Sequence, residues 1–240
     1  MSALLRGEWI KFRSVRSPWV MIGLAVAMAL LIGGIAADSS KGRDPAESLA
    51  VSSTFVIVLL LVLGVQLIAQ EYRFGTIRAT FTSVPQRSRL ILAKMIFGVA
   101  VGLVSALIAI AGSFVVASIV ANSYGHSIPI DARLVETVSG YVLAAGISVA
   151  LGIAVGSITR NSALGITAVL LDMFVLESLV TVFASEGLGS VLPFRAAFAS
   201  IPATSIRSGL SPWFVAVLVY AAWAVGLAVI GTVIVERRDP

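Results

Sequence analysis

Cysteine is absent from the 240 residues, histidine occurs once, and charged side chains make up only 12% of the chain. The absence of cysteine excludes disulfides and thiolate metal sites. A single histidine, His126, cannot form the clusters that hold a catalytic metal. Soluble domains carry about 25% charged residues. The low charge therefore excludes an ordinary water-soluble protein.

Nucleotide-binding and hydrolytic motifs are also missing. The sequence holds no G-x-x-x-x-G-K-[ST] phosphate loop and no H-E-x-x-H, and no nucleophile–base arrangement is evident. ATP hydrolysis on this chain is not expected. The net charge of +5 could suggest nucleic acid, but the basic residues cluster beside apolar runs. Anionic headgroups and membrane topology explain that placement better, so no nucleic-acid partner is predicted.

Long uncharged runs dominate the remainder, and 58% of the residues are hydrophobic. Runs of about 20 apolar residues predict membrane-spanning helices. The chain is therefore predicted to be an all-α integral membrane protein and a single transmembrane domain. The six expected spans cover residues 19–37, 49–69, 91–121, 137–158, 163–184 and 213–235.

The segment 1–17 precedes the first span and is amphipathic. Leu5, Trp9 and Phe12 form an apolar stripe flanked by arginines, which is typical of a helix lying in the headgroup region. Pro18 is then expected to turn the chain into the membrane. A secretory signal peptide is the alternative interpretation of the first basic and apolar segments.

Topology follows from the positive-inside rule. With both termini in the cytoplasm, the inner segments hold twelve of the seventeen Lys and Arg residues and the outer segments hold five. The chain is therefore predicted to be a multi-pass membrane protein with both ends cytoplasmic.

The cytoplasmic loop 70–90, between spans 2 and 3, is strongly basic. Phe74, Ile77 and Phe81 fall on one stripe of a helix, and Pro85 ends it. Such a helix could lie on the membrane surface or present its aromatic ridge to a soluble partner. An ordinary basic loop is the simpler alternative.

Two acids interrupt the fifth span. Asp172 lies near its middle and Glu177 nearer its outer end, and on an ideal helix they point about 140° apart. Ionisable groups at this depth are costly unless paired or hydrated. They are either substrate-facing or proton-sensitive groups in a cavity, or structural groups that pair with a neighbouring helix or lie at an outer end already in water. No basic residue lies at depth within the apolar part of any span, so a hydrogen bond, a protonated acid or a water-lined cavity is left. The apolar segment 185–212 that follows is expected to form one or two short helices, an outer hairpin.

A stripe of small residues marks the fourth span and predicts close helix packing rather than a substrate site. Its members recur every four residues: Gly140, Ala144, Ser148, Gly152 and Gly156.

Two stretches resemble the ABC-2-type permease family, the membrane subunits of ABC transporters. They are EWIKFRSVRSPW at 8–19 and EYRFGTIRATFTSVPQRSRLILAK at 71–94. In that family an acid, Gly-Thr, a proline with nearby arginines and a lysine mark the first cytoplasmic loop. The matching residues here are Glu71, Gly75, Thr76, Pro85, Arg87, Arg89 and Lys94.

The resemblance implies a permease that pairs with a separate ABC ATPase, which would bind ATP and Mg, and with a second permease copy, identical or related. Residues 70–90 would form the coupling helix. Its implied ATPase-coupling residues are Glu71, Arg73, Phe74, Gly75, Thr76, Ile77, Arg78 and Phe81. Glu71 would orient this helix or meet basic residues of the N-terminal helix. The family implies export of a drug, antibiotic, lipid or other amphipathic compound, often across a bacterial cell membrane.

Two other functions remain open from the sequence. Asp172 and Glu177 would suit an ion- or proton-coupled carrier, although no internal inverted repeat is visible. A non-transporting membrane scaffold or sensor subunit would have the same composition.

Overall fold

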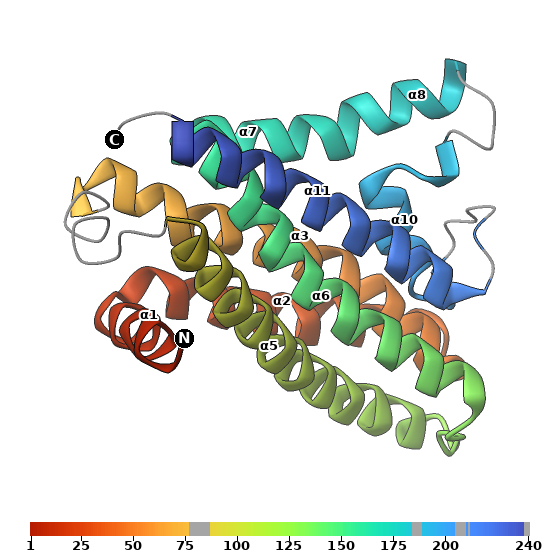
Figure 1. Cartoon of the computed structure of the whole chain (residues 1–240). Coiled ribbons are helices and arrows are strands. Elements are labelled where there is room, and N and C mark those ends of the chain that lie inside the picture. Colours follow the sequence, from red (N-terminus) through yellow and green to blue (C-terminus); the bar gives the residue numbers. More distant parts are fainter. Residues whose placement is uncertain (77–86, 184–188, 205–209, 211, 238–240) are drawn as a thin grey trace.

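The bundle is built from long apolar helices (Figure 1). The computed structural model describes residues 1–76, 87–183, 189–204, 210 and 212–237, and every regular element among them is helical. Six helices in this described part are long and apolar enough to cross a membrane. The predicted all-α class with six spans is confirmed.

Ten helical elements have defined bounds in the described part of the chain. They are α1 (Ser2–Ser14), α2 (Arg16–Ser39), α3 (Pro45–Arg73), α5 (Arg87–Ser123), α6 (Ala132–Thr159), α7 (Ser162–Leu171), the π-helix η1 (Asp172–Leu176), α8 (Glu177–Phe183), α10 (Pro193–Ala199) and α11 (Trp213–Arg237). At 37 residues α5 is about 55 Å long. It exceeds the roughly 30 Å hydrocarbon layer, so it must tilt or extend beyond that layer.

Polar caps set several of the helix starts. The carboxylate of Asp44 accepts from the Glu47 amide at 3.0 Å at the start of α3. Asp131 accepts from the Leu134 amide at 2.8 Å at the start of α6. Each cap satisfies one of the amide groups that lack an intrahelical partner, so each helix begins at the polar residue that precedes its apolar run.

The turn into the first span lies at Val15, not at Pro18 as predicted. Val15 is extended, with φ −105° and ψ 134°, and separates α1 from α2. Pro18 lies in the first turn of α2, where the missing amide would have had no partner and the ring does no harm.

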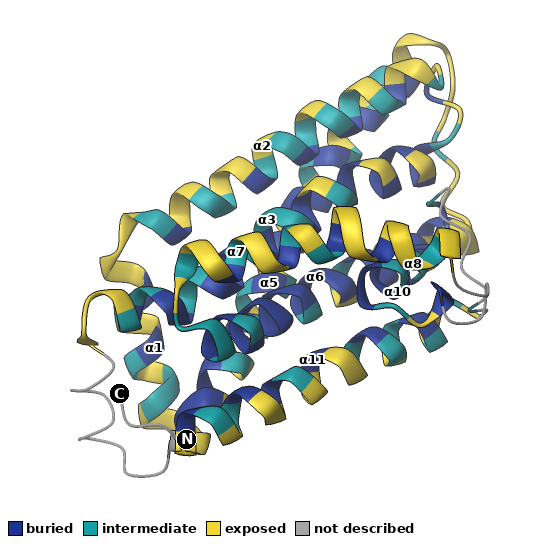
Figure 2. Cartoon of the chain, turned by 90° about the horizontal axis from the view of Figure 1, so that it is seen from above, coloured by how far each residue is buried: buried dark blue, intermediate teal, exposed yellow. Residues whose placement is uncertain are grey.

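Helices α3 and α6 form the centre of the bundle (Figure 2). Of the 18 most apolar consecutive residues in each of these helices, 67% are buried. In the span Ser162–Phe183 the corresponding share is 17%. A Cβ on Gly64 would collide with the Val149 carbonyl, and one on Gly152 would collide with the Leu61 carbonyl. The two backbones therefore touch, which only glycine permits at these positions.

The small-residue stripe of α6 contacts three neighbours, not one helix. Gly152 and Gly156 pack on α3, Ser148 hydrogen-bonds the Tyr220 hydroxyl of α11 at 2.8 Å, and Gly140 packs against the Ser200 carbonyl after α10. A four-residue repeat rotates about 40° per step on a helix of 3.6 residues per turn. Gly140 and Gly156 thus point about 160° apart, so the stripe winds around α6.

The fifth span contains a π-helical turn. Gly165, Val169, Met173 and Glu177 are its buried residues, spaced every four positions. The Glu177 amide bonds the Asp172 carbonyl, an i→i+5 bond of the π-helix. The 140° separation expected of Asp172 and Glu177 on an ideal helix is therefore wrong for this segment. Asp172 is partly exposed, whereas Glu177 is buried.

Glu177 is satisfied by backbone donors in the predicted outer hairpin. Its two carboxylate oxygens accept from the Phe194 amide at 2.6 Å and the Arg195 amide at 2.9 Å, at the start of α10. For Glu177 this contact corresponds to the structural alternative of pairing with a neighbouring helix. In the predicted hairpin region, α10 is the helix with defined bounds, and residues 185–188, 205–209 and 211 lie outside the described part.

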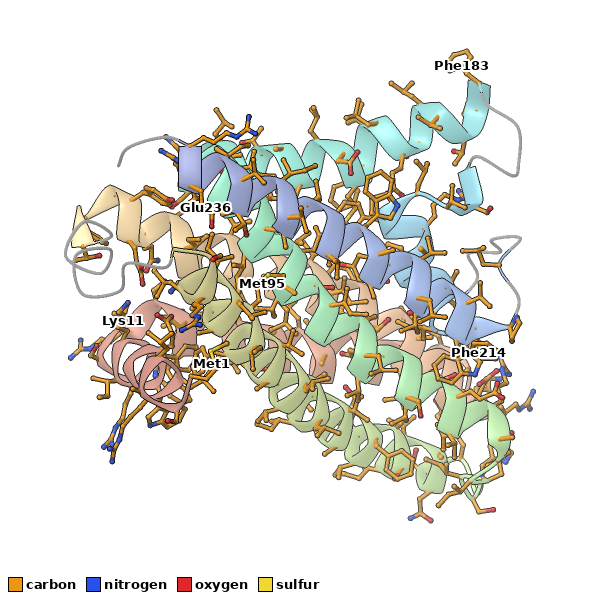
Figure 3. The ribbon with its side chains drawn as sticks, in the orientation of Figure 1. Met1, Lys11, Met95, Phe183, Phe214 and Glu236 are labelled. Atoms are coloured by element: carbon orange, nitrogen blue, oxygen red, sulfur yellow. The ribbon has the colours of Figure 1, made fainter. Side chains whose placement is uncertain are left out.

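The two ends of the bundle are distinct (Figure 3). Lys11 and Glu236 lie at one end, and Phe183 and Phe214 lie at the opposite end. The end with Lys11 also carries the termination of α3, and therefore the start of the predicted coupling segment. We call it the α1 end.

Candidate functional site

Helix α1 is anchored to the bundle by Phe12. The Phe12 ring lies 5.4 Å from Phe97 of α5 and 5.2 Å from Trp19 of α2, edge to face in both cases. Trp9, on the predicted apolar stripe, remains 47% exposed, whereas Glu8 is buried. The face of α1 that meets the bundle therefore includes an acid as well as an aromatic ring, which the stripe alone did not predict.

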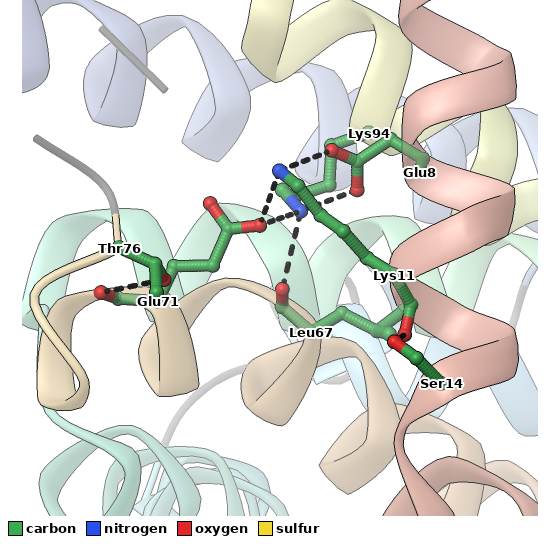
Figure 4. Close-up of polar contacts among 7 residues, drawn as sticks. All are labelled: Glu8, Lys11, Ser14, Leu67, Glu71, Thr76 and Lys94. Carbon is green, nitrogen blue, oxygen red and sulfur yellow. Dashed lines mark hydrogen bonds and ion pairs between the residues drawn. The ribbon is translucent and has the colours of Figure 1, made fainter. Parts of the chain in front are cut away.

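Four charged side chains, three of them buried, form a cluster where α1, α3 and α5 meet (Figure 4). Lys94 is 2% exposed, and its ammonium contacts the Glu8 carboxylate, the Glu71 carboxylate at 2.9 Å and the Leu67 carbonyl at 3.2 Å. Lys11 lies 3.0 Å from Glu71 and 3.2 Å from Glu8. We call Glu8, Lys11, Glu71 and Lys94 the charge cluster.

The charge cluster balances two acids with two bases. An isolated buried ammonium would be strongly destabilising, whereas a paired and hydrogen-bonded one is tolerated. Lys94 donates three contacts, matching the three donors of its ammonium. Burial alone would lower the pKa of Lys11, but the Glu71 and Glu8 carboxylates outweigh it and raise that pKa above its usual value. Lys11 therefore remains charged at neutral pH.

Glu71 holds the cluster together, since one of its oxygens, Oε1, accepts from both lysines. This places Glu71 against a basic residue of the N-terminal helix, one of the two arrangements that the family resemblance left open. Its second oxygen, Oε2, is buried and has no hydrogen-bond partner in the described part of the chain.

Sequence reasoning assigned no partners to Glu8 and Lys94. Two signals could have identified them. Glu8 is the one acid in an otherwise basic N-terminal segment. Lys94 lies within the apolar sequence of α5, with apolar residues on both sides of it. Each is a charge on a face that must be buried, so each required a partner of opposite sign.

The predicted coupling segment begins directly beside the cluster. Helix α3 ends at Arg73, Phe74 is its C-cap residue, and Gly75 follows with φ +69°. Phe74 is 69% exposed, and the Arg73 guanidinium lies 5.6 Å from its ring centroid. The Thr76 hydroxyl contacts the Glu71 carbonyl at 3.4 Å. Ile77, Arg78 and Phe81 lie outside the described residues.

A cavity of about 330 Å³ separates the start of the coupling segment from α1 and α2. Its wall combines Glu71 and Lys94 of the charge cluster with Phe12, Leu67 and Phe74. The amphipathic wall suits contact with another chain or a lipid better than a reaction, and the described residues contain no group of three or more metal-ligating side chains.

The fold and this site define a class of protein: a polytopic helical membrane protein whose N-terminal helix is ion-paired to its second and third spans. The family model described as ABC-2 family transporter protein matches residues 4–176. The chain therefore belongs to the ABC-2 transporter family and is a membrane permease of an ABC transporter. The match runs from α1 through η1 and ends before Glu177. No curated protein matches the chain.

Proposed function

We propose that the chain is the permease subunit of an ATP-driven exporter and that residues 70–90 dock onto a separate ABC ATPase. ABC-2 permeases work with an ABC ATPase, and membership of the family implies that partner here. The observation that carries the docking site is Phe74, a large aromatic side chain left 69% exposed at a helix end between Arg73 and Gly75. Exposed aromatics flanked by arginine are typical anchors of protein interfaces.

The charge cluster supplies the mechanical part of the proposal. An ATPase that moves the docked segment must also move the spans, and this requires a rigid connection. Glu71 lies two residues before Arg73 and is bonded to α1 and α5 through Lys11 and Lys94. Displacement of the docked segment would thereby reach three helices at once.

Two permease copies would form the translocation path, with both termini in the cytoplasm and ATP and Mg on the partner. The exposed surfaces of α2, α7, α8 and α11 are apolar, which suits an amphipathic cargo such as a drug, antibiotic or lipid. The carrier alternative loses part of its basis, because Glu177 already accepts two backbone hydrogen bonds. Asp172 alone would remain for proton coupling.

The test is co-purification with a co-expressed ABC ATPase. Phe74→Asp should reduce the recovered ATPase roughly tenfold or more, as expected for loss of a central aromatic anchor. Phe183→Asp is the matched control, since Phe183 is 83% exposed at the opposite end of the bundle. Equal loss in both variants, or transport against a gradient by the purified permease alone, would contradict the proposal.

A further inference from the structure

A second cavity at the α1 end is lined by two arginines, one of which, Arg73, also flanks the proposed docking residue Phe74. Its volume is about 350 Å³, and it is formed where α3 ends and where α6 turns into α7. The lining residues are Tyr72, Arg73, Arg160, Asn161, Ser162 and Ala163. Figure 1 shows that α7 begins and α11 ends at this end of the bundle.

Arg160 is held in place by its backbone and by two side-chain contacts. It adopts a left-handed conformation, φ +52°, as the residue that ends α6, a region that residues other than glycine seldom occupy. One guanidinium nitrogen donates to the Ile234 carbonyl of α11 at 3.1 Å, and the group lies 5.4 Å from the Tyr72 ring centroid. The side chain is thus fixed in position before any ligand arrives.

Both arginines of the cavity lack a counter-charge. In the described part of the chain no carboxylate pairs with Arg73 or Arg160, whereas Lys94 and Arg133 each have one. The Nε atom of Arg160 is buried and has no hydrogen-bond acceptor among the described residues. Two guanidinium groups on one cavity repel each other unless an anion lies between them. Phosphate suits them because guanidinium groups bind its oxygens in pairs.

The position of the cavity indicates where the phosphate comes from. Leu164, four residues after Arg160, is 58% exposed, and Val233 near the end of α11 is 40% exposed. Exposed apolar side chains therefore begin close to Arg160 along α7 and α11. Arg237, three residues after the Ile234 carbonyl that Arg160 contacts, is exposed as well. Basic pockets between the ends of spanning helices are where anionic headgroups bind.

We propose that this cavity binds the phosphate of an anionic phospholipid headgroup, with Arg160 and Arg73 as its ligands. The hydroxyl of Ser162 and the positive end of α7 add weaker attraction. The bound lipid would connect the end of α3, which leads into the coupling segment, to the α6–α7 turn and, through Arg160, to α11. The binding itself is independent of the ATPase.

Binding is measured by native mass spectrometry of the full-length protein released from nanodiscs of phosphatidylglycerol or of phosphatidylcholine. Retained phosphatidylglycerol should exceed retained phosphatidylcholine. Arg73→Gln and Arg160→Asn should each reduce the affinity for phosphatidylglycerol about fivefold, the effect of one basic residue at a membrane surface. Asparagine tolerates the left-handed conformation at position 160 and removes only the positive charge and the paired N–H donors of the guanidinium. Arg89→Gln, an exposed arginine outside this cavity, is the control.

A titration with inorganic phosphate in lipid-free detergent, followed by intrinsic fluorescence, separates the two sources of phosphate. Saturable binding of inorganic phosphate that Arg160→Asn abolishes, without preference for phosphatidylglycerol, would show a free-anion site and overturn the lipid assignment. Equal loss in Arg89→Gln would show general surface attraction instead. Unchanged lipid binding together with loss of the ATPase in Arg73→Gln would identify a protein contact. Arg73 is exposed, so its variant tests the proposal even if Arg160→Asn does not fold.

Discussion

Lys94 of α5 and Glu71 of α3 meet at 2.9 Å, with the lysine side chain only 2% exposed. Neither residue could occupy this position alone, because each would be a buried charge without compensation. Glu8 completes the neutralisation from α1. The N-terminal helix is therefore held to the bundle by an electrostatic requirement of the spans as well as by its aromatic contacts.

We expect Lys94→Met to lower the free energy of unfolding by about 3 kcal/mol, the cost of breaking a buried pair and leaving its partners unpaired. The measurement is reversible unfolding in detergent micelles. Arg89→Gln, on an exposed position of the same helix, should change it little. Adding Glu8→Gln and Glu71→Gln to Lys94→Met should recover most of the loss. A triple variant as unstable as Lys94→Met would show that packing, not charge, is responsible.

Glu177→Gln should weaken the attachment of α10 to the fifth span. The amide side chain offers one acceptor where the carboxylate offers two, so one of the Phe194 and Arg195 amides loses its partner. The expected cost is about 2 kcal/mol, typical of a hydrogen bond to a charged group. Hydrogen exchange at these two amides should accelerate accordingly. Asp172→Asn is the matched control, and comparable acceleration in that variant would refute the specific role of Glu177.

Gly152→Ala should separate α3 from α6 at their closest point. The new methyl group would collide with the Leu61 carbonyl, which is backbone and cannot rotate away. Overpacking of this kind costs about 1–3 kcal/mol, to be measured as loss of stability in micelles. Gly226→Ala provides the comparison, because a methyl group on Gly226 of α11 would meet nothing within 4 Å. That substitution should be neutral or slightly stabilising, and a similar loss in both would argue against the close contact.

Tyr124 should ionise at higher pH than an ordinary tyrosine. Its hydroxyl donates to Asp38 at 2.9 Å, and this hydrogen bond to a carboxylate favours the protonated phenol and raises the pKa of Tyr124 above its usual value. Asp38→Asn removes the negative charge and should lower that pKa. Phenolate absorbance during an alkaline titration gives the value, with Tyr124→Phe identifying the signal. An unchanged titration in Asp38→Asn would show that the contact does not form in solution.

Hydropathy was sufficient to predict the six spans, because a membrane helix must satisfy its backbone internally and bury few charges. Partners across the bundle were harder to predict. The donors that satisfy Glu177 are backbone amides, which every residue but proline carries, so no side chain marked them. Helix α2 begins after Val15, whose extended conformation separates it from α1. No feature of the sequence indicates that conformation.

Only part of the site could be predicted, because its contacts also depend on how separate helices pack against one another. Glu71 and Lys94 stand out as members of a family motif, but their depth follows from how α1 packs, and the stripe of Leu5, Trp9 and Phe12 left the buried acid on that helix unassigned. The winding of the α6 stripe from Gly140 to Gly156 likewise required its three neighbours to be known. No sequence signal marked the left-handed backbone of Arg160.

The contact of Gly64 with Val149 and of Gly152 with Leu61 also bears on biogenesis. Helix α3 enters the membrane during synthesis well before α6 has been made, so its glycine surface first faces lipid. Insertion and helix association are separable stages in membrane proteins. The contact between α3 and α6 at the centre of this permease can therefore form only after the fourth span has been inserted. A nascent chain that stalls earlier leaves the α6-binding surface of α3 exposed to lipid.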